Sequence, residues 1–128
     1  MSDCNNRKSS NQNINIVISE TALSGIAFKE SIDLALVCAA FDQKVNLIFV
    51  EQGVCNLIKS QNYNDLKDKN HLEILKGLEY YEVENIVAEK ESLDNYSINN
   101  EDLIEQCEIL SMENIKKLHM HSHTFVSF

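Results

Sequence analysis

Four cysteines carry the most reactive side chains in this 128-residue sequence: Cys4, Cys38, Cys55 and Cys107. A thiolate can act as a nucleophile or hold a persulfide sulfur only where it is exposed and its pKa is lowered. No two of the four are separated by just two residues, which excludes zinc-ribbon and thioredoxin-like motifs. Because Cys38 and Cys107 lie in apolar stretches, both are predicted to be buried and inert. Cys4 lies in a polar N-terminal stretch with no partner that would activate it.

Cys55 has a more favourable position, two residues after Gly53 in a predicted turn. The turn follows an apolar strand, and a helix that begins there could stabilise a thiolate at its N-terminus. The alternative is that Cys55 packs as a small apolar side chain. Both interpretations stay open, and Cys55 and Cys38 are the candidate thiols for sulfur chemistry.

Three histidines alternate near the C-terminus, at His119, His121 and His123. In an extended segment they would project from one face, within reach of a single zinc or copper ion. The alternative is a solvated loop between a helix and a strand. These three are the candidate metal ligands, and we expect no cofactor.

Tyr80 and Tyr81 stand together before a predicted strand. Tyrosine offers a large contact area with a polar tip, so the pair is a candidate subunit interface, with core packing as the alternative. The acidic residues around them are interpreted as a solvated face with no catalytic role: Glu79, Glu82, Glu84, Glu89 and Glu91.

The length and composition bound the class of protein. At 128 residues with 44% hydrophobic content, one globular domain is expected over residues 14–128, after a flexible tail over residues 1–13. The net charge of −9 argues against direct nucleic-acid binding. The longest apolar run, residues 34–41, is too short to cross a membrane, and no signal peptide is evident at the N-terminus. A cytoplasmic protein with reduced thiols is expected.

The order of predicted elements alternates strand and helix. Strands are predicted over residues 14–18, 45–50, 83–88 and 124–128, and helices over residues 27–41, 54–58 and 71–78. The first strand, helix and strand form a right-handed crossover with two parallel strands. Residues 103–118 fit one long helix by period alone, although Ser111 favours a new helix start. The fold class is α/β, and its sites are expected at the carboxyl ends of the strands.

Several stretches, taken in order, resemble the TusC family, also called DsrF. They are Glu-Ser-Ile-Asp-Leu-Ala-Leu at residues 30–36, Val-Asn-Leu-Ile-Phe-Val-Glu-Gln-Gly-Val at residues 45–54, and Leu-Lys-Gly-Leu at residues 75–78. The resemblance runs from about Ile14 to Phe128. It implies a three-layer α/β/α DsrE-like fold, similar to flavodoxin, with a mostly parallel sheet of about five strands. It also implies a strand within residues 103–110 and a helix over residues 111–118.

The resemblance further implies a non-catalytic structural subunit of a cytoplasmic complex, a dimer of TusB, TusC and TusD heterotrimers. That complex takes persulfide sulfur from TusA and passes it to TusE for 2-thiolation of the tRNA wobble uridine. In the related catalytic subunit the sulfur-carrying cysteine follows the third strand, and here Glu89 occupies that place. Two alternatives remain: a DsrF-type subunit of a sulfur-oxidation complex, and a sulfurtransferase that uses Cys55 or Cys38 itself.

Overall fold

The computed structural model describes residues 13–22, 26–59, 66–83 and 85–128. The expected tail over residues 1–13 therefore lies outside the described residues except for Asn13, which begins the first strand. Glu84 also lies outside them.

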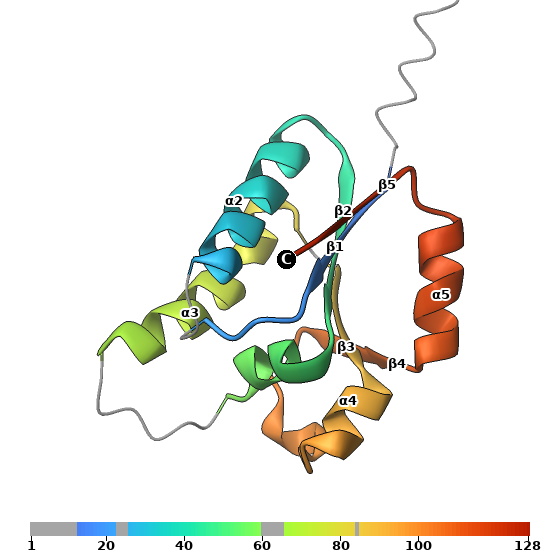
Figure 1. The fold of residues 1–128 in the computed structure, drawn as a ribbon. Coiled ribbons are helices and arrows are strands. Elements are labelled where there is room, and N and C mark those ends of the chain that lie inside the picture. The colour runs from blue at the N-terminus through green and yellow to red at the C-terminus, as the bar shows by residue number, and fades with distance from the viewer. Residues whose placement is uncertain (1–12, 23–25, 60–65, 84) are drawn as a thin grey trace, which may run out of the picture.

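One five-stranded parallel sheet forms the centre of the molecule (Figure 1). Its order is β4-β3-β2-β1-β5. The strands are β1 (Asn13–Ile18), β2 (Lys44–Phe49), β3 (Asn85–Glu89), β4 (Cys107–Leu110) and β5 (Thr124–Ser127). The β-branched and apolar runs of β1 and β2 suit central strands that are buried on both faces. The expected α/β class with five mostly parallel strands is confirmed, and every pairing between these five strands is parallel.

Helices cover both faces of this sheet. On one side lie α2 (Ala27–Ala40) and α3 (Leu66–Gly77), and on the other lies α5 (Met112–Met120) (Figure 1). The main core lies under α2 and α3, where Ile16, Leu47 and Leu75 have no exposed surface. A smaller cluster forms around Ile48, Val87 and Ile115 under α5. The arrangement is the three-layer α/β/α fold that was expected.

Short helical turns connect the longer elements. They are η2 (Glu51–Leu57), η3 (Leu78–Tyr81), α4 (Lys90–Asn95) and η4 (Asn100–Asp102). The sequence pattern did not indicate α4, because six residues are too few to show a helical period. α3 begins five residues before the predicted start at His71, and η2 takes the place of the predicted helix over residues 54–58.

The ambiguous stretch over residues 103–118 is resolved in favour of a strand followed by a helix. Ser111 caps α5, because its Oγ accepts a hydrogen bond of 3.2 Å from the backbone N–H of Asn114. The interpretation of residues 103–118 as one long helix is wrong. Among the described residues, no helix is both long and apolar enough to span a membrane.

Candidate functional site at the carboxyl edge of the sheet

The carboxyl ends of β2 and β3 hold a buried carboxylate. Glu89 is the last residue of β3 and is only 9% exposed, so its interpretation as part of a solvated acidic face is wrong. Its backbone pairs with Leu110 of β4, and its side chain meets the first turn of α4. Glu79, Glu82 and Glu91 are exposed, as expected.

A short chain of hydrogen bonds holds this carboxylate. The hydroxyl of Ser92 donates to Oε1 of Glu89, and the same Oγ accepts a hydrogen bond of 2.7 Å from the backbone N–H of Glu51. Ser92 is 2% exposed. Glu51 has a φ of 50°, a left-handed conformation that costs energy for a residue with a Cβ. These hydrogen bonds thus join the turn after β2 to the end of β3.

Removal of the shared hydroxyl should destabilise this edge. We expect Ser92→Ala to lower the free energy of unfolding by about 1–3 kcal/mol, because it leaves the Glu51 N–H and the Glu89 carboxylate without their common partner. Urea denaturation measures the change. Ser127→Ala, at an exposed position on β5, is the matched control and should change the stability by less than about 0.5 kcal/mol. Equal effects of the two variants would contradict the proposed role of Ser92.

The turn after β2 also lies against the end of β1. The carbonyl oxygen of Ile18 accepts a hydrogen bond of 3.0 Å from the Val50 N–H. A Cβ on Gly53 would lie 2.1 Å from that same oxygen, so only glycine fits there. Asn56 fixes the loop that follows β1, because its side chain accepts from the Ala22 N–H and donates to the Glu20 carbonyl. The three carboxyl ends are therefore held in one rigid arrangement.

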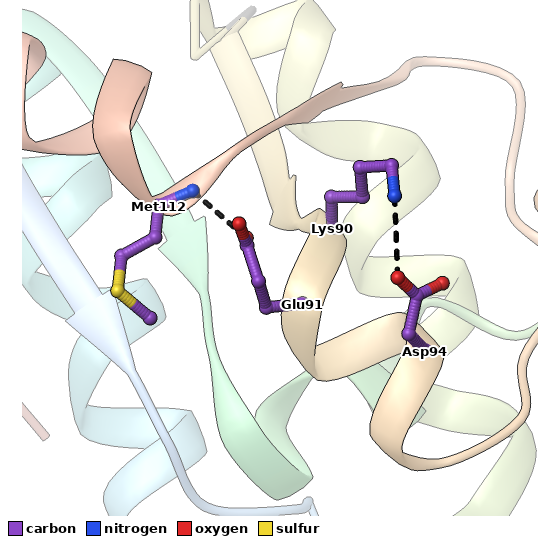
Figure 2. A network of polar contacts seen from close by, with 4 residues as sticks. All are labelled: Lys90, Glu91, Asp94 and Met112. Atoms are coloured by element: carbon purple, nitrogen blue, oxygen red, sulfur yellow. Dashed lines mark hydrogen bonds and ion pairs between the residues drawn. The ribbon is translucent and has the colours of Figure 1, made fainter.

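The start of α5 is tied to the same region. The carboxylate of Glu91 accepts a hydrogen bond of 2.8 Å from the backbone N–H of Met112, which joins α4 to α5 (Figure 2). Lys90 and Asp94 form an exposed ion pair of 3.2 Å on α4, a pair that contributes little to stability (Figure 2). Glu91 therefore serves to position α5.

None of the three described thiols is activated. Burial raises the pKa of Cys55 and of Cys38. Burial, together with the charge of Glu108, raises the pKa of Cys107 to about 12, against a backbone hydrogen bond from Ala88 that lowers it. The hypothesis that η2 stabilises a thiolate at Cys55 is therefore not supported, and these thiols are protonated at neutral pH. Cys4 lies outside the described residues.

The three histidines do not share one face. His119 is in the last turn of α5, His121 caps that helix, and His123 lies in the loop before β5. The Nδ1 of His123 accepts a hydrogen bond from the Asn13 N–H, and His119 faces Asn15 instead. No group of three ligating side chains suited to a metal ion occurs in the described part of the chain. The extended arrangement that a shared metal would require is therefore not present.

His119 is the last member of a row of hydrogen-bonded side chains, the polar ladder, which runs from Asn46 on β2 through Asn15 on β1. Asn46 donates a hydrogen bond of 2.8 Å to Oδ1 of Asn15, so the amide nitrogen of Asn15 faces Nδ1 of His119, at 3.0 Å. That nitrogen must be unprotonated to accept the bond. Burial lowers the pKa of His119 below its usual value of 6.5, in agreement with this geometry.

The ladder predicts a pH dependence of stability. Above the usual histidine pKa, the contribution of the His119 hydrogen bond to stability is fully present. This contribution is lost as the pH falls from about 6.5 towards the lower pKa of the folded state, because the unfolded chain binds a proton at His119 before the folded chain does. The urea midpoint of the parent chain should fall between about pH 7.5 and pH 5, and we expect this fall to be smaller in His119→Gln. His121→Gln, at an exposed position, is the control. An unchanged fall in His119→Gln would refute the assignment.

The tyrosine pair lies on the surface. Tyr80 is 84% exposed and Tyr81 is 64% exposed, so core packing is wrong for both. Tyr80 borders a groove of about 830 Å³ between α3, η3 and the segment before β4. Lysines and glutamates line the groove together, so its charges are mixed: Lys59, Lys76, Glu73, Glu79 and Glu105. The interface role of the pair stays a prediction.

Sequence reasoning missed Ser92 and the Asn15–Asn46 ladder. Ser92 stands three residues after Glu89, the spacing at which two side chains meet across the first turn of a helix. Asn15 and Asn46 are polar residues inside apolar strands and occupy equivalent positions in β1 and β2. A buried polar pair at matched register was the signal that could have found them.

The structure defines a class of protein: an α/β/α domain in which helices cover both faces of a parallel sheet, and a buried, hydrogen-bonded carboxylate lies at the carboxyl ends of the strands. Residues 12–128 match the DsrE/DsrF-like family, and the chain belongs to this family. The resemblance inferred from the sequence is confirmed.

Several relatives and solved structures place the chain within this family. A protein named TusC homolog from Vibrio parahaemolyticus is 26% identical over 102 residues, which cover 80% of this chain and 86% of the relative. The intracellular sulfur oxidation protein DsrF of Allochromatium vinosum is 33% identical over 76 residues, 59% of this chain and 56% of DsrF. The crystal structure of the ychN protein from E. coli has a TM-score of 0.74 at 19% identity and covers 91% of this chain and 99% of its own. It shares the fold.

Proposed function

We propose that the chain is a non-catalytic structural subunit of a sulfur-relay complex. The observation that carries this proposal is the buried, hydrogen-bonded Glu89 at the end of β3, where the family resemblance expects the sulfur-carrying cysteine of a catalytic relative. A carboxylate holds no sulfane sulfur. The similarity to proteins named TusC homolog supports the same subunit role.

The complex we propose is a TusBCD-type dimer of heterotrimers in the cytoplasm. TusB- and TusD-like subunits are the direct partners, and TusA- and TusE-like carriers deliver and receive sulfur through the complex for 2-thiolation of the tRNA wobble uridine. The net charge of −9 supports contact with proteins and argues against direct contact with RNA.

A second candidate is a DsrF-type subunit of a sulfur-oxidation complex. The similarity to DsrF of Allochromatium vinosum favours it, although the matched segment covers only 56% of DsrF. The two candidates share the fold and the scaffold role and differ in the pathway served. Deletion of the gene distinguishes them: loss of 2-thiouridine from tRNA supports the first, and normal thiolation with impaired sulfur oxidation supports the second.

Persulfide loading tests the non-catalytic role. The purified chain, incubated with a persulfide donor and measured by mass spectrometry with peptide mapping, should gain no sulfur atom on Cys38, Cys55 or Cys107, because these thiols are protonated and half-buried or buried. A TusD-like subunit treated in parallel is the positive control. A stable sulfur adduct on Cys55 or Cys38 of this chain would establish a sulfurtransferase and overturn the proposal.

A further inference from the structure

β5 forms one edge of the sheet. β5 is the last strand of the sheet, and among the described residues no strand pairs with its far side. The N–H of Phe128 donates to Val17 of β1 and its carbonyl accepts from Ser19, so the backbone groups of Phe128 face β1. Backbone groups of successive residues in a strand point to opposite sides, so those of Phe125 and Ser127 point outward. An extended peptide could pair with them.

Apolar side chains flank this edge. Phe125 is 50% exposed, and its ring meets that of His119 on α5 with centroids 4.4 Å apart. On α5, Lys116 precedes His119 by three residues and therefore lies on the same flank of the helix. Met120, the last residue of α5 and four residues before the start of β5, is 79% exposed. An exposed apolar flank beside unpaired backbone groups is typical of a surface that another chain covers.

The local charge identifies the kind of partner. The chain as a whole carries a net charge of −9, yet residues 114–128 contain no acidic side chain. Two lysines and three histidines lie in this segment, and the exposed Lys116 stands three residues before His119, whose ring meets that of Phe125. This segment therefore attracts an acidic peptide, in contrast to the net negative charge of the chain as a whole. A second copy of the same acidic chain is correspondingly disfavoured.

We propose that β5 binds an extended, acidic segment of a partner protein, which adds to the sheet as a sixth strand. Backbone hydrogen bonds to Phe125 and Ser127 supply the pairing, and Lys116 with Met120 selects the side chains. The inference does not depend on the proposed function, because it requires neither a sulfur carrier nor a particular pathway. It assigns a role to a surface separate from Tyr80 and Tyr81.

A peptide titration of the full chain tests the proposal. The probe is a blocked peptide of alternating valine and threonine with glutamates at both ends, and the comparison peptide has lysines in their place. NMR should show slower amide exchange at Phe125 and Ser127 with the acidic peptide, and weaker binding of the basic one. Absence of protection at these two amides with millimolar acidic peptide would overturn the proposal.

Two charge reversals on α5 provide a matched pair of variants. Lys116→Glu should weaken binding of the acidic peptide about three- to fivefold, the effect of one surface charge pair. Lys117→Glu changes the net charge equally, but residue 117 lies two positions from His119 and therefore on another flank, so it should bind like the parent chain. Equal weakening by the two variants would show that only the net charge matters, and would contradict the assigned role of Lys116. A concentration-dependent dimer with protected Phe125 and Ser127 amides in the absence of peptide would instead make a second copy the occupant.

Discussion

Gly53→Ala should lower the free energy of unfolding by about 3 kcal/mol, near the upper end of the range for overpacked sites. The added Cβ would lie 2.1 Å from the Ile18 carbonyl oxygen and 2.9 Å from its carbon, so the backbone of β1 or of η2 must move. That movement also disturbs the hydrogen bond of 3.0 Å from the Val50 N–H to the same oxygen. The carboxyl edge would lose the arrangement that places Glu51 over Ser92.

Gly77→Ala is the matched control for this substitution. A Cβ at Gly77 would meet no atom within 4 Å, and its φ of −81° suits any residue. Urea denaturation of the two variants should show a large loss for Gly53→Ala and no loss, or a gain of about 0.5 kcal/mol, for Gly77→Ala. Equal stabilities would contradict the close approach of η2 to β1.

The double substitution Tyr80→Ala with Tyr81→Ala should weaken assembly with TusB- and TusD-like partners by about thirtyfold or more, since an interfacial tyrosine often contributes about 2 kcal/mol to binding. Both rings are largely exposed, and η3, which carries them, contacts α2. Truncation of exposed side chains should leave the stability of the isolated chain nearly unchanged.

Tyr96→Ala provides the control for the tyrosine pair. Tyr96 is 47% exposed and follows α4. Isothermal titration with the partner subunits should give the parent affinity for Tyr96→Ala and a strongly reduced one for the double variant. Unchanged affinity of the double variant would remove Tyr80 and Tyr81 from the interface.

The larger elements could be predicted from the sequence because their hydrophobic periods are long. The β-branched run after Asn13 and the three-and-four spacing from Phe28 to Ala39 leave little choice of structure. The short α4 showed no period. The strand and helix within residues 103–118 became clear only from the family resemblance and the capping residue Ser111.

The site was less predictable because it depends on contacts between distant segments. Cys55 lies in the expected turn, yet its pKa depends on burial that local sequence does not reveal. Glu89 looked like its acidic neighbours, and only its contact with Ser92, which also binds Glu51 from another turn, distinguishes it. The histidines alternate in sequence, but α5 continues through Met120 and separates them onto different surfaces.

Light scattering after size exclusion, with the full chain alone and mixed with TusB- and TusD-like subunits, tests the central claim most directly. The proposed scaffold role predicts one species with the mass of a dimer of heterotrimers that contains this chain. A chain that stays apart from both partners at micromolar concentration, as a monomer or as a homo-oligomer, would contradict the account.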